Sequence, residues 1–226
     1  MGAAIEINNL MKSFAKGNRK INVLNGLNLT VAAGESLAVL GVSGAGKSTL
    51  INILGTLDRP SSGSVFFDGL NVFEWEEKKL ARFRNKKIGF IFQFFNLLPE
   101  FTSLENTMMP ALVSGISRRQ AKERAEIILN ELRLGDRMDH KPGELSGGEQ
   151  QRVAVARSLI MEPEILLADE PTGNLDRSTA VKIEDMLIDL NRNRKVTLIV
   201  VTHNKSLADR MSRNIGLIDG RVLACE

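Results

Sequence analysis

The chain has 226 residues, of which 43% are hydrophobic and 25% are charged, and its formal net charge is +3. This length fits one domain, or one domain with a subdomain, and is sufficient to bury a core. The composition is that of an ordinary globular protein. Because the basic excess is small and basic residues are interleaved with acidic ones, the charge gives no reason to expect nucleic-acid binding.

No targeting segment is visible at the N-terminus. Residues 1–6 lack a basic start followed by an apolar run. No apolar stretch reaches the ~18 residues that a membrane-spanning helix needs, so we expect any role at a membrane to depend on an embedded partner. The single cysteine, Cys225, cannot form an internal disulfide, which fits a reducing compartment.

In chain order, the pattern predicts strands, then a helical block, then alternating strands and helices. The predicted strands cover residues 5–10, 27–31, 36–40, 65–67, 88–91, 165–168 and 197–201. The helical block spans residues 102–159, and within it residues 118–134 form a helix with one buried face. The apolar residues on that face are Ala121, Ala125, Ile128, Leu129 and Leu132. A closing hairpin over residues 214–224 turns at Asp219-Gly220.

A glycine-rich segment matches the phosphate-binding pattern G-x-x-x-x-G-K-[ST]. It consists of Gly41, Val42, Ser43, Gly44, Ala45, Gly46, Lys47, Ser48 and Thr49. The segment follows a predicted strand and opens a predicted helix near Lys47, so backbone N–H groups and the helix N-terminus can hold phosphate oxygens. In such loops the lysine, here Lys47, reaches the β- and γ-phosphates, and the hydroxyl of Ser48 is a ligand of Mg²⁺.

Two acidic residues, Asp169 and Glu170, follow the buried strand at residues 165–168. Ligand groups lie at the carboxyl ends of parallel strands. Asp169 is therefore predicted to hold Mg²⁺ through its water shell, and Glu170 to polarise an attacking water. Taken alone, an acidic pair after a strand is more often a turn or a helix N-cap, but the phosphate loop upstream favours the catalytic interpretation.

Residues 145–150, Leu-Ser-Gly-Gly-Glu-Gln, begin a second helix with the features of an anion site. Ser146 caps this helix, and Gly147 and Gly148 expose its first N–H groups. A plain N-cap with flexible glycines is the simpler interpretation of three small residues alone. Phosphate loops also occur in GTPases, kinases and helicases, and this second helix start separates the chain from those classes.

Together these motifs resemble the ATP-binding cassette (ABC) family along nearly the whole chain, and they occur in the family's order. The further matches are the Q-loop glutamine at Gln93, the signature motif at residues 145–150, the D-loop at residues 173–176 with Asp176, and the switch histidine at His203. A lone histidine at a strand end would more often be structural, so the role of His203 is implied by the resemblance.

Phe14 stands where the family usually has a tyrosine that stacks on adenine. The chain contains no tyrosine. A phenylalanine keeps the π face and loses only the hydroxyl, so we expect stacking to survive.

The resemblance implies that two copies of the chain sandwich two ATP molecules head to tail. Each ATP would lie between Lys47 of one copy and residues 146–148 of the other. Gln93 would contact Mg²⁺ and the attacking water and pass that state to a membrane partner. His203 would contact the γ-phosphate and hold Glu170 and the water in place.

The resemblance also implies an α/β P-loop fold with a mainly parallel sheet core, an N-terminal antiparallel β subdomain and an inserted α-helical subdomain. We expect one domain over residues 1–226, with the core at about 1–92 and 160–226 and the helical subdomain at about 93–159. Integral membrane permease subunits would dock near Gln93, at the cytoplasmic face of the bacterial inner membrane.

The apolar residues around Gln93 are open to two interpretations. They are either core residues or part of an exposed docking groove for a partner helix. The set is Phe92, Phe94, Phe95, Leu97 and Leu98.

Finer details resemble a bacterial subgroup that holds lipoprotein-releasing ATPases, macrolide-type exporter ATPases and division-linked ATPases. Residues 84–93, 95–99 and 104–106 carry this likeness, and residues 98–102 and 207–213 look most like the lipoprotein-releasing members. We therefore expect ATP hydrolysis that powers the release of lipoproteins from the inner membrane toward the outer membrane. A macrolide or peptide exporter, or a division-linked regulator without cargo, is the alternative. Macrolide-type exporters carry the cassette fused to a membrane segment, and this chain ends without one.

Other classes of nucleotide-binding protein fit the sequence less well. Translation factors and DNA-repair ATPases usually carry two cassettes or a long coiled-coil insertion, and neither is present. A GTPase would have Asn-Lys-x-Asp for guanine, whereas residues 204–207 read Asn-Lys-Ser-Leu. A kinase would have no use for the signature motif.

Overall fold

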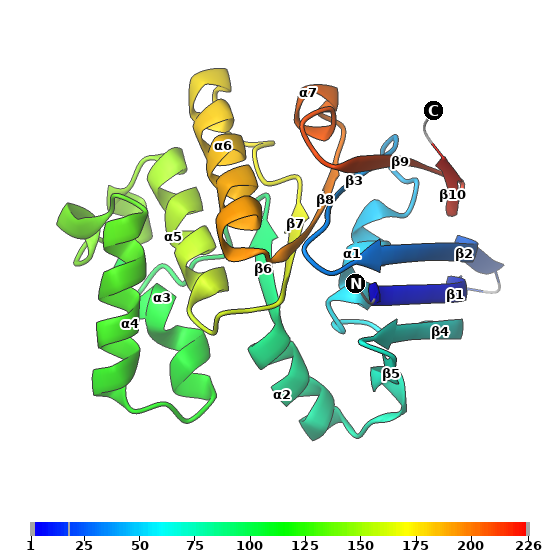
Figure 1. Cartoon of the computed structure of the whole chain (residues 1–226), viewed down its shortest axis with the longest axis horizontal. Helices are drawn as coiled ribbons and strands as arrows, with labels where there is room; N and C mark the ends of the chain where they lie inside the picture. The colour runs from blue at the N-terminus through cyan, green and yellow to red at the C-terminus, as the bar shows by residue number, and fades with distance from the viewer. Residues whose placement is uncertain (1–2, 18, 225–226) are drawn as a thin grey trace.

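The computed structural model describes residues 3–17 and 19–224. The expectation that Cys225 forms no internal disulfide therefore concerns a residue outside the described ranges. Two sheets and a block of helices make up the fold (Figure 1). The first sheet is antiparallel and has the order β2-β1-β4-β5. Its strands are β1 (Ala3–Lys16), β2 (Arg19–Ala32), β4 (Ser62–Phe67) and β5 (Leu70–Asn71).

The second sheet is mainly parallel and has the order β10-β9-β3-β8-β7-β6. Its strands are β3 (Ser36–Leu40), β6 (Ile88–Phe92), β7 (Ile165–Asp169), β8 (Thr197–Thr202), β9 (Arg213–Ile218) and β10 (Arg221–Ala224). Only β10 pairs in the antiparallel sense. The two predicted sheet types are therefore confirmed.

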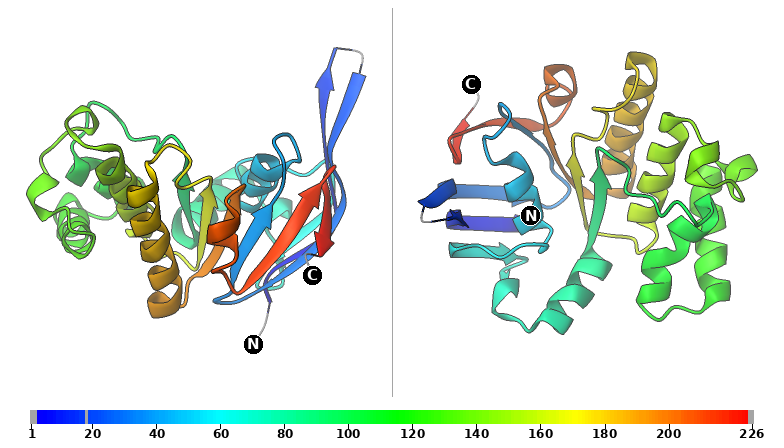
Figure 2. Two further views of the ribbon diagram at one scale, coloured as in Figure 1. Left: turned by 90° about the horizontal axis from the view of Figure 1, so that it is seen from above. Right: turned by 180° about the vertical axis from the view of Figure 1, so that it is seen from behind.

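Helices cover the parallel sheet and extend beyond its β6 edge (Figures 1 and 2). They are α1 (Lys47–Leu54), α2 (Glu77–Lys87), α3 (Ser103–Val113), α4 (Arg118–Glu131), α5 (Gly147–Leu159), α6 (Arg177–Arg194) and α7 (Lys205–Ala208), with 3₁₀ turns at Val72–Glu74, Gly135–Arg137 and Pro142–Glu144. Within the described ranges, no helix is both long and apolar enough to cross a membrane. The division between a core and a helical subdomain stays a prediction.

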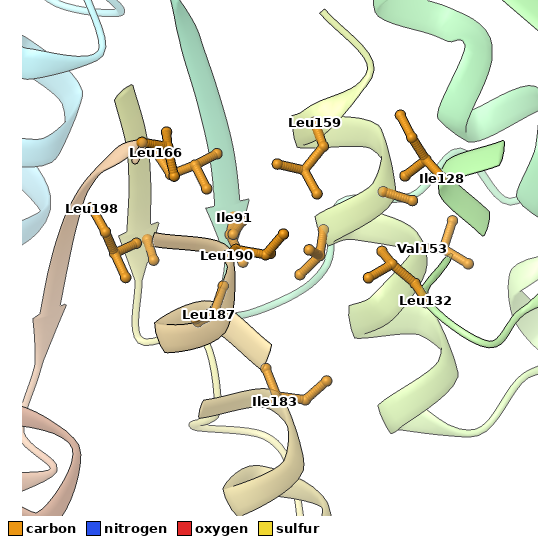
Figure 3. Close-up of a cluster of buried hydrophobic side chains, with 14 of the residues drawn as sticks. Ile91, Ile128, Leu132, Val153, Leu159, Leu166, Ile183, Leu187, Leu190 and Leu198 are labelled. Carbon is orange, nitrogen blue, oxygen red and sulfur yellow. The ribbon is translucent and has the colours of Figure 1, made fainter. Parts of the chain in front are cut away.

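Each central strand contributes to two hydrophobic clusters, one on each face of the sheet. In β7, Leu166 and Ala168 belong to the cluster shared with the helical block, and Ile165 and Leu167 belong to the cluster shared with α1 and the antiparallel sheet. This alternation follows from the two-residue period of a strand. Figure 3 shows Leu166 among side chains from α5 and α6. Burial on both faces explains why the predicted strands are apolar throughout.

The predicted helix at residues 118–134 is shorter than the sequence pattern suggested, since α4 ends at Glu131. Arg133 adopts a left-handed backbone, with φ at 58°, and this conformation cannot continue a right-handed helix. Leu132 and Leu134 are nevertheless buried, so the apolar pattern continued past the end of the helix. The predicted closing hairpin is confirmed, and both Asp219 and Gly220 have positive φ in its turn.

The N-terminus of α5 is fixed by a reciprocal capping box. The Ser146 hydroxyl accepts a hydrogen bond from the Glu149 backbone N–H, and the Glu149 carboxylate accepts from the backbone N–H of Ser146 at 2.8 Å and from its hydroxyl at 2.7 Å. The predicted cap at Ser146 is thus confirmed. The hydrogen bonds from Ser146, with help from Arg137, lower the pKa of Glu149 to about 2.

Glu149→Gln should lower the melting temperature at neutral pH, and the deficit should shrink as the pH falls below about 4.3, the ordinary pKa of a glutamate. The pKa of Glu149 is lower in the folded state than in the unfolded state. The ionised Glu149 carboxylate therefore stabilises the fold fully at pH values above the unfolded-state pKa. This stabilisation is lost as the pH falls toward about 2. Thermal melts between pH 7 and pH 3 check this, with the exposed Glu162→Gln as control. A deficit that stays constant or grows in acid would contradict the prediction.

Candidate functional site

The residues that immediately follow the parallel strands form one edge of the second sheet. Gly41 follows β3, Gln93 follows β6, Glu170 follows β7 and His203 follows β8. The registers bring these strand ends level, because Phe92 pairs with Asp169, Asp169 with Val201, and Leu40 with Thr202. Residues up to 162 positions apart in the sequence (Gly41 and His203) are thereby collected at the carboxyl edge of a parallel sheet.

A cavity of about 600 Å³ opens at this edge. Its lining consists of Val23, Gly41, Val42, Ser43, Gly44, Gly46, Lys47, Ser48, Thr49, Gln93, Asp169, Glu170 and His203. The structure therefore brings together the predicted phosphate loop, the acidic pair, the Q-loop glutamine and the switch histidine. Ala45 of the phosphate loop is buried and lies outside the lining, and Val23 of β2 is a lining residue that the sequence analysis missed.

Two glycines give the phosphate loop its shape. Gly44 and Gly46 have φ values of 82° and 101°, a region that glycine adopts without strain. A Cβ atom on Gly46 would also lie 3.0 Å from the carbonyl oxygen of Val23. Lys47 Nζ donates to the carbonyl oxygens of Gly41 at 2.8 Å and Val42 at 3.2 Å, so its ammonium lies over the loop. The loop and the start of α1 together form an anion-binding concavity.

Glu170 is held by Thr202, the last residue of β8, and by His203, which follows it. One carboxylate oxygen, Oε2, accepts from the Thr202 hydroxyl at 3.0 Å, and the other, Oε1, lies 2.9 Å from Nδ1 of His203. The backbone of Glu170 is left-handed, with φ at 45°, and its N–H donates to the carbonyl oxygen of Val201 at 2.9 Å. Such a backbone costs on the order of 1–3 kcal/mol in a non-glycine residue and is frequent at functional sites.

Asp169 and Ser48 face one another in the cavity. Burial raises the pKa of the Asp169 carboxyl, and the nearby Glu170 adds to that rise, while a hydrogen bond from Ser48 and the charge of Lys47 oppose it. A hydroxyl oxygen beside a carboxylate suits Mg²⁺, which binds proteins through few side chains and takes its remaining ligands from water and phosphate. The described residues contain no group of three or more His, Cys, Asp or Glu side chains placed to hold a metal.

Gln93 is tied to the D-loop by two hydrogen bonds. Its Nε2 donates to Asn174 Oδ1 at 3.0 Å, and Asn174 Nδ2 donates back to the carbonyl oxygen of Gln93 at 3.0 Å. A Cβ atom on Gly173 would lie 2.9 Å from Gln93 Nε2, which explains the glycine beside this pair. Gln93 also lines the cavity, and its side-chain oxygen Oε1 takes no part in these two bonds.

Asp176, at the end of the D-loop, is the N-cap of α6. Its Oδ1 accepts from the backbone N–H groups of Ser178 and Thr179, and hydrogen bonds from Thr179 and Ser178 hold its pKa well below the usual range. Asp176 does not line the cavity.

The signature residues lie apart from this cavity. Ser146, Gly147 and Gly148 are absent from its lining, and β6 and β7 stand between α5 and α1 (Figures 1 and 2). Ser146 is exposed, whereas Gly148 is buried. A Cβ atom on Gly148 would lie 2.4 Å from Thr179 Cγ2, so this glycine also allows α5 to approach α6. The two glycine-containing helix starts of one chain, at Lys47 and at Gly147, therefore lie apart from each other.

Phe14 also lies outside the cavity lining. It is on β1, its side chain is exposed, and Lys12 Nζ lies 4.8 Å from the centre of its ring.

The segment after Gln93 is exposed and borders a groove. None of the five apolar residues around Gln93 is fully buried, and Phe94 is 74% exposed. Arg157 of α5 donates to the carbonyl oxygens of Phe95 and Asn96, both of which have left-handed backbones. The groove, about 450 Å³ in volume, is hereafter called the α2–α3 groove. It is lined by Leu57, Ala81, Arg84, Asn85, Ile88, Gly89, Phe90, Phe92, Asn96, Pro110, Val113, Arg157, Ser158 and Met161.

Comparison with known proteins identifies the family of the chain. The profile of the ABC transporter family matches residues 24–173. A protein described as lipoprotein-releasing system ATP-binding protein LolD, from Syntrophus aciditrophicus, is 68% identical over 98% of this chain and 99% of its own length. A protein of the same description from Geobacter metallireducens is 54% identical over 99% of this chain and 100% of its own length.

Solved structures give the same assignment. The dimeric structure of MJ0796, described as a bacterial ABC transporter cassette, has a TM-score of 0.89 and 41% identity over 96% of each chain. A dimeric post-hydrolysis state of the same cassette, bound to ADP and Pi, has a TM-score of 0.89 and 40% identity over 96% of each chain. The chain therefore belongs to the ABC transporter family, as an ATP-binding and ATP-hydrolysing subunit of the LolD type.

Proposed function

We propose that this chain is the ATPase of a membrane complex that releases lipoproteins from the inner membrane toward the outer membrane. The observation that carries the proposal is the similarity to lipoprotein-releasing ATP-binding proteins over nearly the full length of both chains. The cavity supplies the chemistry that such a subunit needs. Cargo would contact the membrane partner, so the chain itself provides the energy.

ATP binds in the cavity with its phosphates in the loop at residues 41–49 and with Lys47 on the β- and γ-phosphates. Ser48, Asp169 and Gln93 would hold Mg²⁺, which would neutralise negative charge on the phosphates. Glu170 accepts a hydrogen bond from the attacking water and orients it. The contact at 2.9 Å between His203 and Glu170 supports a shared role at the γ-phosphate.

The catalytic unit is a head-to-tail dimer. Because the signature helix start at Ser146 lies apart from the Lys47 cavity of the same chain, we assign it to the ATP held by a second copy. The dimeric form of the MJ0796 cassette supports this arrangement. In the dimer, Asp176 lies at the boundary between the two copies, and Phe14 stacks on adenine from the exposed face of β1.

The membrane partner docks in the α2–α3 groove. The groove lies between helices of the sheet core and the helical block, and its apolar lining suits an amphipathic helix. Phe92 and Asn96, which flank the Gln93 segment, belong to its lining, so movement of Gln93 can reach the partner directly. Since ATP is supplied by the cytoplasm, the chain lies at the cytoplasmic face of the inner membrane.

Glu170→Gln should lower steady-state ATP hydrolysis by at least ~10²-fold while ATP affinity is retained, since a positioned general base contributes roughly 10²–10⁴-fold. Phosphate release and binding of a fluorescent ATP analogue measure the two quantities. Near-normal hydrolysis by this variant would remove Glu170 from the mechanism.

Ser146→Arg, placed in the Glu170→Gln background, should abolish the ATP-dependent dimer and leave the monomer able to bind ATP. The bulky cation enters the partner's site, whereas the cavity of the same chain is untouched. Light scattering after gel filtration measures the mass. Ser117→Arg is the matched control, because Ser117 is also an exposed N-cap, of α4. A dimer that persists with Ser146→Arg would place the signature residues outside the interface.

Val113→Asp should prevent the chain from binding its membrane partner while leaving the ATPase activity of the isolated chain unchanged. Val113 is 73% exposed at the end of α3 and lines the α2–α3 groove. Ile127→Asp is the matched control, because Ile127 is 59% exposed on α4, outside the groove. The measurements are co-purification from membranes and ATP-dependent release of a lipoprotein from vesicles that contain the complex.

An assembled, ATP-hydrolysing complex that releases no lipoprotein would favour the exporter or division-linked alternative.

A further inference from the structure

Behind the cavity, a buried acidic residue joins the two loops that carry Glu170 and His203. Glu184 of α6 is only 3% exposed. Its Oε1 accepts from Asn204 Nδ2 at 2.9 Å and lies 3.5 Å from the hydroxyl of Thr172, and its Oε2 lies 3.6 Å from the guanidinium of Arg210. Thr172 follows Glu170 by two residues, and Asn204 is adjacent to His203. The contacts therefore reach both catalytic loops from one point on α6.

The Asn204 amide is fixed by its other partner. Its Oδ1 accepts from the backbone N–H of Leu207 and caps α7. With the oxygen held by a donor, the amide nitrogen faces the carboxylate of Glu184. Turning the amide over would set its oxygen against the carboxylate and its nitrogen against an N–H group, so only one orientation satisfies both partners.

From Asn204 the hydrogen bonds continue to the carboxylate of Glu170. The Asn204 backbone N–H donates to Thr202 Oγ1 at 3.0 Å, and the Thr202 hydroxyl donates to Glu170 Oε2 at 3.0 Å. His203 lies between Thr202 and Asn204 in the sequence, and its side chain is 75% exposed. Little packing surrounds the imidazole, so its position depends on the backbone at residues 202–204 and on its contact with Glu170.

Burying the carboxylate of Glu184 costs free energy, and its hydrogen-bond and ion-pair partners offset that cost. Burial raises the pKa of its carboxyl, and the charge of Arg210 and the hydrogen bond from Thr172 oppose that rise. A buried carboxylate is tolerated only where donors satisfy it. An apolar residue at this position of α6 would fill the same space at lower cost, but it could not hold Asn204.

We propose that Glu184 and Asn204 are positioning residues for ATP hydrolysis, which hold His203 and Thr202 in place against Glu170 through the hydrogen bond between their side chains. The proposal rests on the proposed roles of Glu170 and His203. Neither Glu184 nor Asn204 lines the cavity. Their loss should therefore lower kcat and leave the affinity for ATP unchanged.

The test exchanges the two functional groups. Asn204→Asp places two carboxylates face to face and should lower kcat by about tenfold or more, since small misplacements of catalytic groups have effects of up to ~10²-fold. The double variant Glu184→Gln with Asn204→Asp restores an amide–carboxylate pair with reversed polarity, and should recover most of the lost kcat. The carboxylate that Asn204→Asp introduces can still cap α7, and Arg210 keeps its ion pair with Asp185.

A third variant separates positioning from folding. Asn204→Ser keeps a side chain that can cap α7 but is too short to reach Glu184, so it should fold, bind ATP and lose kcat. All variants are assayed for kcat, KM for ATP and melting temperature, at a temperature where each is folded. A purely structural role predicts lower melting temperatures with unchanged kcat.

Glu170→Gln in the same assay distinguishes failure of the positioning proposal from failure of the proposed function. If Glu170→Gln is inactive while Asn204→Ser and Asn204→Asp keep the wild-type kcat, the positioning proposal is wrong and the proposed function stands. A double variant no more active than Asn204→Asp would likewise overturn the pairing. If Glu170→Gln is as active as the wild type, the proposed role of Glu170 fails and the positioning proposal fails with it.

Discussion

The cavity at the carboxyl edge of the second sheet depends on the parallel alignment of β3, β8, β7 and β6. In a parallel sheet every strand ends at the same edge, and the register fixes which residues meet there. Here Leu40 is level with Thr202, and Asp169 with Val201. The next residue along each strand is therefore delivered to one cavity without any long-range signal in the sequence. A slip of one residue in β8 would turn His203 to the other face of the sheet.

Strain and buried charge accumulate where these strand ends meet. Glu170 has a left-handed backbone, and Glu184 is buried. Each would destabilise an isolated segment, and each is held by bonds from another element: Val201 and Thr202 for Glu170, and Asn204 for Glu184. Stability is thus exchanged for a fixed geometry around the attacking water, which is a common compromise at catalytic sites.

Helix α5 contacts the segment that follows Gln93. Helix α5 begins at the signature motif, and Arg157, near its other end, holds the carbonyl oxygens of Phe95 and Asn96. Of these two residues, Asn96 lines the α2–α3 groove. One helix therefore joins the signature motif to the segment that follows Gln93.

By itself, the sequence determined the class of the protein and most of its elements. The phosphate loop, the acidic pair after β7 and the capped start of α5 are local patterns whose chemistry is encoded in consecutive residues, so they could be read without coordinates. The end of α4 could not, because the left-handed Arg133 follows an apolar pattern that continues to Leu134. Val23, Arg157 and the pair of Glu184 with Asn204 were also beyond reach. Their roles arise only when segments far apart in the sequence, up to 180 residues in the case of Val23 and His203, pack together. Contacts at such separations leave no periodicity in the sequence.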